Sequence, residues 1–228
     1  MRILVLSSGG VDSTTCLALA VQEVGHENVI SLSVYYGQKH DKEMEAARKV
    51  AEYYQVEHLE LDLAAIFSGS RCSLLKQSTA EIPKDSYADQ LAQSEGPVST
   101  YVPFRNGLFL SAAASVALSH DCGKLLYGAH ADDAAGAAYP DCSVQFVEAM
   151  DRAIREGTGG LLHLEAPFVS VSKSQVVQTG LRLGVPYELT WSCYEGGDRP
   201  CCKCGTCIDR IEAFRLNGVM DPLLKEES

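Results

Sequence analysis

The residues best suited to chemistry lie in one short stretch near the N-terminus, Ser8-Gly9-Gly10-Val11-Asp12-Ser13. An apolar run at residues 3–6 precedes it, and apolar residues spaced as on one face of a helix follow it: Leu17, Ala20, Val21 and Val24. A strand, a glycine turn and a helix N-terminus together gather unpaired backbone N–H groups at the positive end of a helix dipole. The stretch therefore predicts a phosphate site, and an ordinary strand-to-helix turn is the alternative.

This stretch is not a Walker loop, because no lysine follows the glycines. It is similar to the SGGxDS pyrophosphate loop of the N-type ATP pyrophosphatases, which split ATP between the α and β phosphates. The resemblance implies catalytic roles for Asp12 and Ser13. It also implies a nucleotide site formed by Ser7, Ser8, Gly9, Gly10, Val11, Asp12, Ser13, Thr14, Thr15, Cys16 and Leu17.

A second group of reactive residues lies near the C-terminus, where four cysteines have the spacing C-x7-C-x2-C-x2-C: Cys193, Cys201, Cys204 and Cys207. Two steps of two residues bring three thiolates onto one tight loop, and the first cysteine can fold back as the fourth ligand. This pattern is typical of a closed, structural zinc site, and an iron–sulfur cluster is the alternative. Since the nine cysteines are odd in number and four are clustered, they favour metal ligation over a disulfide framework.

Composition restricts the class of protein. The chain has 228 residues and a net charge of −11, without a run of basic residues, so broad nucleic-acid binding is not expected. It contains no apolar stretch of about 18 residues and no signal-peptide pattern at its N-terminus. We therefore expect a cytoplasmic protein without a membrane partner, with small molecules as ligands.

The elements that must position these residues alternate along the chain. Strand patterns occupy 3–6, 29–36, 56–63, 124–129 and 161–168, and helical patterns follow them. This alternation predicts a doubly wound α/β domain with a mainly parallel sheet over residues 1–189. Residues 68–100 lack periodicity and predict an irregular excursion near the site, either a lid or a disordered linker. Residues 190–228 are predicted to form a small zinc-binding appendage.

Five motifs together resemble one family, the 7-cyano-7-deazaguanine synthases. They are the loop at Ser8, Tyr36-Gly37-Gln38, Tyr101-Val102-Pro103 with Arg105-Asn106, Tyr139-Pro140-Asp141-Cys142, and Ser192-Cys193-Tyr194 with the closing cysteines. The resemblance implies a Rossmann-like fold of the adenine nucleotide alpha hydrolase type. It also implies an ATP-dependent ligase that converts 7-carboxy-7-deazaguanine and ammonia into the nitrile preQ0, a queuosine precursor, with ATP, Mg²⁺ and one structural Zn²⁺ per chain. A homodimer is expected on the same ground.

Site residues follow from the motifs and from position along the chain. Lys173 opens a helix after a strand and is the candidate cation for the leaving pyrophosphate, with a surface lysine as the alternative. The residues expected to contact substrate are Tyr36, Gln38, Arg105, Asn106, His130, Asp132, Tyr139 and Asp141. For His130 and Asp132, a purely structural role is the alternative. Two departures from the family pattern are Cys202, where glycine is usual, and a longer loop at residues 134–138.

Other functions use the same loop. A sulfur-transfer enzyme acting on tRNA would need a free persulfide-carrying cysteine, and an amide ligase would stop after one activation. A non-catalytic nucleotide-binding module would leave Asp12 and the motif at Tyr139 without a purpose, and a divergent relative would act on another carboxylate. These functions stay as alternatives at this point.

Overall fold

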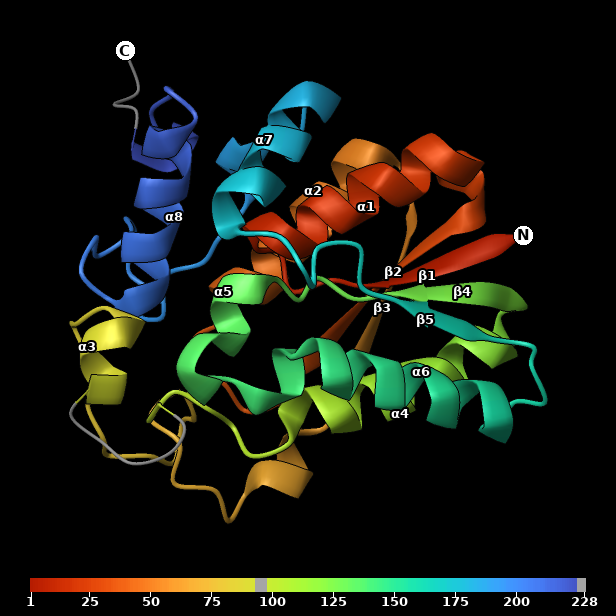
Figure 1. Ribbon diagram of the computed structural model, residues 1–228, viewed down its shortest axis with the longest axis horizontal. Coiled ribbons are helices and arrows are strands. Elements are labelled where there is room, and N and C mark those ends of the chain that lie inside the picture. The colour runs from red at the N-terminus through yellow and green to blue at the C-terminus, as the bar shows by residue number, and fades with distance from the viewer. Residues whose placement is uncertain (93–97, 225–228) are drawn as a thin grey trace.

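A five-stranded parallel sheet lies at the centre of the computed structural model (Figure 1), which describes residues 1–92 and 98–224. The strands are β1 (Arg2–Leu6), β2 (Val29–Tyr35), β3 (Glu57–Asp62), β4 (Cys122–Leu126) and β5 (His163–Glu165). Their spatial order is β3-β2-β1-β4-β5, and every neighbouring pair is parallel. The predicted doubly wound α/β fold is therefore confirmed.

The strand order has a direct consequence for ligand binding. From β1 the chain first moves outward through β2 and β3, and it later returns to add β4 and β5 on the other side of β1. In open parallel sheets, ligands bind in the crevice at the carboxyl ends of the strands where the direction of winding reverses. The carboxyl ends of β1 and β4 mark this point here.

Helices cover both faces of the sheet (Figure 1). One face carries α1 (Val11–Val24), α2 (Lys42–Tyr54) and α7 (Lys173–Leu183), and the other carries α4 (Arg105–Ser119) and α6 (Val144–Gly157). The helices α3 (Tyr87–Ala92), α5 (Ala131–Ala134) and α8 (Gly205–Leu216) complete the described chain, together with short 3-10 turns.

The alternation of side chains in β1 explains why two layers form. Ile3 and Val5 belong to one buried cluster with residues of α1, α7 and α8, whereas Leu4 belongs to a second cluster with residues of α4 and β4. All three side chains are fully buried. A central parallel strand is covered on both faces, which is why its sequence is continuously apolar.

The expected excursion at residues 68–100 is partly built into the core. Cys72, Leu74, Leu75 and Ile82 are buried in a third cluster, and Gln38 forms an isolated antiparallel bridge with Leu75. The helix α3 lies within this segment, and residues 93–97 lie outside the described residues. A lid function for the excursion stays a prediction.

The C-terminal segment packs onto the sheet domain. Helix α8 lies against α7, and Phe214 of α8 is fully buried in the same cluster as Ile3. Cys193, Cys204 and Cys207 belong to the third cluster, which also contains residues near the carboxyl end of β2. In the part of the chain that the structure describes, no helix is long and apolar enough to cross a membrane.

Candidate active site and metal centre

One cleft opens at the carboxyl ends of β1, β2 and β4, where the winding reverses. Its empty space, including the part open to solvent, is about 1220 Å³. The predicted site residues that line it are Ser7, Ser8, Gly10, Asp12, Ser13, Tyr36, Gln38, Arg105, Asn106, His130, Tyr139 and Lys173.

The first wall of the cleft is the turn between β1 and α1. Helix α1 begins after Gly10 without a side-chain cap, so its first N–H groups remain available to a ligand. The Ser13 hydroxyl accepts a hydrogen bond from the Ser8 backbone N–H at 3.1 Å and lies 3.2 Å from the Ser8 hydroxyl. This arrangement suits an anion at the helix N-terminus.

The two glycines of this turn, Gly9 and Gly10, differ in what surrounds them. Gly9 has φ +76° and does not line the cleft, since a Cβ there would lie 2.5 Å from the Glu43 carbonyl oxygen and 2.6 Å from the Ala47 nitrogen. It therefore permits close packing of the turn against α2. Gly10 lines the cleft, and a Cβ there would meet only ordinary contacts, with Ser8 Oγ at 3.4 Å.

A charged cluster, defined here as Asp12, His130, Asp133 and Lys173, forms the second wall. The Lys173 ammonium donates to Asp12 Oδ2, and its Nζ lies 3.4 Å from His130 Nε2. The same His130 nitrogen lies 3.3 Å from Asp133 Oδ2 and 3.8 Å from Asp12 Oδ1. The charged side chains of the cluster thus come from the first turn of α1, from the segment that follows β4 and begins α5, and from the start of α7.

Lys173 is held in this cluster by two features of the α7 N-terminus. Ser172 and Gln175 form a capping box, in which each side chain accepts from the other residue's backbone N–H. Asp132 Oδ2 accepts the Lys173 backbone N–H at 2.7 Å. Asp132 therefore positions the start of α7 and, contrary to the sequence-based expectation, does not line the cleft.

Burial and neighbouring charges shift the pKa values in the cluster. Burial opposes ionisation of Asp12, but the charges of Lys173 and His130 outweigh it and lower the pKa of Asp12. Burial likewise opposes the charge on Lys173, and Asp12 and Asp133 outweigh it and raise the pKa of Lys173. Burial raises the pKa of Asp133, against the opposing effect of His130.

The third wall, which we call the aromatic wall, consists of Tyr36, Glu43, Arg105 and Phe109. The rings of Tyr36 and Phe109 lie 5.6 Å apart, and the Arg105 guanidinium lies 5.1 Å from the centre of the Tyr36 ring. Arg105 Nη1 also donates to the Tyr36 hydroxyl at 3.2 Å. Gln38 lines the cleft nearby, where its side-chain oxygen accepts the Tyr36 backbone N–H at 2.9 Å.

Three tyrosines from separate segments meet on the remaining side of the cleft. The Tyr194 hydroxyl lies 2.9 Å from that of Tyr87 and 3.3 Å from that of Tyr139. Burial raises the pKa of each of these hydroxyls, so they stay protonated and can donate. Tyr139 also bonds to Thr100 at 2.6 Å, which ties the end of the excursion to the site.

Several predicted residues do not line the cleft, and the geometry gives the reason for each. Val11, Thr14, Thr15, Cys16 and Leu17 are buried. Thr15, for example, bonds to the Val11 carbonyl and the Tyr187 hydroxyl inside the protein. The side chains of these residues pack inside the protein, and their place in the nucleotide site stays a prediction. Asp141 is buried and accepts the Asn106 backbone N–H at 2.9 Å, so it supports the start of α4.

Other residues line the cleft without having been predicted. They are Glu43, Tyr87, Tyr127, Asp133, Cys142, Trp191, Ser192, Tyr194, Thr206 and Asp209, among others. The position of Asp133 in the sequence could have predicted its place in the site, because it directly follows Asp132 after a predicted strand. Glu43 opens a helix after another predicted strand, whereas Tyr87 lies in the excursion and had no such signal.

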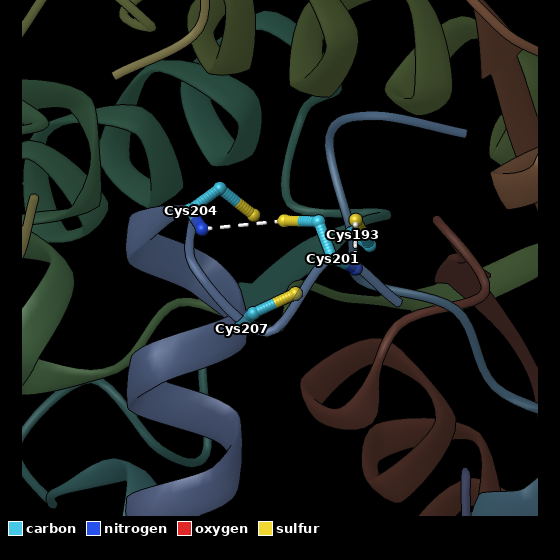
Figure 2. A group of neighbouring side chains, drawn as sticks. All are labelled: Cys193, Cys201, Cys204 and Cys207. Carbon is cyan, nitrogen blue, oxygen red and sulfur yellow. Dashed lines mark hydrogen bonds between the residues drawn. The ribbon is translucent and has the colours of Figure 1, made fainter. Parts of the chain in front are cut away.

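The four clustered cysteines converge, as Figure 2 shows. Cys204 and Cys207 lie at the start of α8, Cys201 on the loop before it, and Cys193 on a separate segment that returns to them. All four Sγ atoms lie within 4.8 Å of one another. A tetrahedron of 2.3 Å metal–sulfur bonds has edges of about 3.8 Å, so the four sulfurs can close on a single ion after small adjustments. Cys202 is exposed and is not part of the group.

The sequence matches one known protein family over nearly its whole length. The family model described as "Queuosine biosynthesis protein QueC" matches residues 2–218. The chain belongs to this family. Among similar QueC-type relatives, the 7-cyano-7-deazaguanine synthase of Archaeoglobus fulgidus is 44% identical over 228 residues, 100% of this chain and 91% of that protein. The 7-cyano-7-deazaguanine synthase of Caldicellulosiruptor saccharolyticus is 46% identical over 223 residues, 98% of this chain and 95% of that protein.

Solved structures with the same fold are more distant in sequence. The NMN synthetase of Francisella tularensis has a TM-score of 0.52 and 16% identity, covering 96% of this chain and 78% of that one. The U34-tRNA thiolase NcsA of Methanococcus maripaludis has a TM-score of 0.52 and 17% identity, covering 85% of this chain and 60% of that one. At this identity the likeness shows the fold and nothing more specific.

Proposed function

We propose that the protein converts 7-carboxy-7-deazaguanine, ammonia and ATP into 7-cyano-7-deazaguanine, a precursor of queuosine. The observation that carries the proposal is the meeting of the uncapped α1 N-terminus with Asp12 and Lys173 in one cleft. Membership of the QueC family and the names of its full-length relatives support the same substrate and product.

In the first activation, a carboxylate oxygen of the substrate attacks the α-phosphorus of ATP, forming an acyl-adenylate and releasing pyrophosphate. Negative charge develops on the leaving pyrophosphate, and the uncapped N–H groups in the first turn of α1 would donate to it. The ammonium of Lys173 supplies a positive charge from the other side. Donors and charges that are already in place need no reorganisation during the reaction, which is why they lower its barrier.

Ammonia then displaces AMP from the acyl-adenylate and gives the amide. In the second activation the amide oxygen attacks a second ATP, again releasing pyrophosphate. Loss of AMP from carbon and of the two protons from nitrogen leaves the nitrile. The same walls serve both rounds, because acid and amide present an oxygen to the same α-phosphorus.

Magnesium, when bound, would neutralise negative charge on the phosphates of ATP. Asp12 fits a role beside it, since its Oδ1 is buried without a hydrogen-bond partner among the described residues. Cys193, Cys201, Cys204 and Cys207 would hold one zinc ion per chain, with no open position for chemistry. The close spacing of the sulfurs favours one ion over an iron–sulfur cluster, whose several metal atoms would hold them farther apart.

A cytoplasmic location and a homodimer also belong to the proposal. They rest on the family resemblance and on the composition of the chain. Light scattering coupled to size-exclusion chromatography measures the mass in solution, and a mass equal to one chain at micromolar concentration would remove the dimer from the proposal.

The reaction is tested by counting products. The protein is incubated with 7-carboxy-7-deazaguanine, ATP, Mg²⁺ and ammonium, and products are separated and identified by mass spectrometry. We expect two AMP and two pyrophosphate per nitrile, with the amide detectable when ATP is limiting and converted when it is supplied directly. One AMP per turnover with the amide as end product would reduce the protein to an amide ligase. A product that contains sulfur would favour the thiolation alternative.

A further inference from the structure

Glu43 is an acid of the cleft whose carboxylate has no partner in the part of the chain that the structure describes. It lies in the first turn of α2, lines the cleft and is half-buried. No hydrogen bond or ion pair to its carboxylate is found among residues 1–92 and 98–224. Asp12 and Asp133 line the same cleft, but each of them has a basic partner in the charged cluster.

The position of Glu43 is fixed by the packing of its backbone. Its carbonyl oxygen lies where a Cβ on Gly9 would approach to 2.5 Å, so the first turn of α2 rests directly on the turn that begins α1. Burial raises the pKa of Glu43 against the opposing charges of His40 and Arg105, which places the carboxyl in a poorly hydrated part of the cleft. Such an acceptor gains strongly from a ligand that offers it N–H donors.

Arg105 provides the complementary donors on the same wall. Its guanidinium lies against the Tyr36 ring and donates one hydrogen bond to the Tyr36 hydroxyl. Within the described residues no other hydrogen bond from this side chain is found. Since a guanidinium carries five N–H donors, others remain for a ligand. Glu43 and Arg105 line the same cleft, and no ion pair joins them among the described residues.

We propose that Glu43 and Arg105 hold the pyrimidinone edge of the deazaguanine ring and make the site specific for it. This inference rests on the proposed function. The edge presents a carbonyl oxygen, a ring N–H and an exocyclic amino group side by side. Arg105 donates to the oxygen, and the two carboxylate oxygens of Glu43 accept from the ring N–H and the amino group. Tyr36 and Phe109 offer flat apolar surfaces to the ring itself.

This pattern excludes the other base in the reaction from the same place. Adenine presents an amino donor next to an unprotonated ring nitrogen, so one Glu43 oxygen would face a second acceptor. A site that is built to hydrogen-bond a group rejects analogues that lack it, because its buried polar atoms are then left unpaired. Glu43 is therefore expected to act on the affinity for the deazaguanine and not on that for ATP.

The test compares Glu43→Gln with Glu45→Gln, an exposed acid two residues further along the same helix. Glu43→Gln should raise the KM for 7-carboxy-7-deazaguanine about 10- to 100-fold, the value of a charge-assisted hydrogen bond, while kcat and the KM for ATP change less than about threefold. Glu45→Gln should match wild type. The ratio of kcat/KM between this substrate and its analogue without the 2-amino group should fall by a similar factor in Glu43→Gln only.

Equilibrium binding keeps this inference separate from the proposed function. Calorimetry measures the binding of 7-cyano-7-deazaguanine and of its analogue lacking the amino group without turnover. Glu43→Gln should weaken the binding of 7-cyano-7-deazaguanine and leave that of the analogue unchanged. If wild-type protein binds and discriminates but makes no nitrile, the proposed function fails and the recognition stands. An unchanged KM and discrimination in folded Glu43→Gln, or a shift in the KM for ATP instead, would overturn the recognition alone.

Discussion

The charged cluster and the aromatic wall line one cleft, yet their charged side chains are paired in different ways. In the charged cluster each acid already has a base, with Asp12 on Lys173 and Asp133 on His130. In the aromatic wall the Glu43 carboxylate has no partner within the described residues, and the Arg105 guanidinium uses only part of its donors. In the first, each acid has a basic partner before any ligand binds, and Asp12 Oδ1 alone of its carboxylate oxygens is a buried atom without a hydrogen-bond partner among the described residues. In the second, the carboxylate of Glu43 would gain its partner only from a ligand. Changes in the first should alter chemistry and stability together, and changes in the second should alter binding.

The largest expected effect comes from removing the cation of the charged cluster. Lys173→Met leaves no positive charge beside the departing pyrophosphate, and we expect kcat/KM to fall about 10²- to 10³-fold, as for the loss of one group that stabilises transition-state charge. The rate of pyrophosphate release measures it. Lys42 does not line the cleft, and its ammonium lies 5.9 Å from the centre of the Trp191 ring, so Lys42→Met is the matched control and should stay within about threefold of wild type. A Lys173→Met enzyme of near wild-type rate would remove the cluster from the chemistry.

The next largest effect is expected from substituting one of the four clustered cysteines. This change should mainly affect ligand binding at the aromatic wall. Cys193, Cys204 and Cys207 share a buried cluster with Tyr36 and Phe109. Cys204→Ser should therefore lose the metal, lower the Tm by about 10 °C and raise the KM for the deazaguanine more than that for ATP. Metal content is measured by elemental mass spectrometry on the purified protein.

Cys202 offers a control for this change within the same loop. It is exposed and lies outside the group of four, so Cys202→Ser should keep one zinc per chain and the wild-type Tm. Iron and sulfide in the wild-type protein, with the absorbance of a cluster, would contradict the zinc assignment.

A pair of glycine variants separates packing from ligand contact at the turn that begins α1. Gly9→Ala places a Cβ against the α2 backbone at a left-handed φ, and we expect it to lose about 3 kcal/mol of stability. Gly10→Ala meets only ordinary contacts and adds a methyl group facing the cleft, so its Tm should stay within about 2 °C of wild type while turnover falls. Denaturant melts and steady-state rates distinguish the two. Equal loss of stability in both would mean that Gly10, like Gly9, is required for packing.

These comparisons also show which parts of the molecule the sequence could predict. The turn at Ser8 and the four clustered cysteines are each local in sequence, so their spacing alone predicts that these residues come together. The sheet follows from the alternation of patterns, but strand order does not, because it depends on contacts between distant segments. Tyr87 and Tyr194 are 107 residues apart in the sequence but in contact in the structure, and no local sequence pattern predicts such a contact. Asp132 was chosen over Asp133 because a sequence does not tell which of two adjacent acids faces the cleft.

The smallest expected effect concerns Asp133 and its dependence on pH. Burial raises the pKa of Asp133 above 3.8, its usual value, so the folded protein binds this proton more tightly than the unfolded chain does. A carboxyl of this kind stabilises the fold at low pH, and that contribution is lost as the pH rises through its folded pKa. Asparagine cannot ionise and escapes the loss. The Tm of Asp133→Asn minus that of wild type should therefore increase from about pH 4 to about pH 8.

The difference between the two proteins is the quantity to follow, because effects of pH on the metal centre are common to both and cancel. Differential scanning fluorimetry at closely spaced pH values measures this difference. Activity should fall in Asp133→Asn even where stability rises, since His130 loses the carboxylate that lies 3.3 Å from its Nε2. A protein that is more stable and less active is expected where a buried charge is kept for function. A difference that shrinks with rising pH would mean that His130 and Lys173 outweigh burial at Asp133, as they do at Asp12.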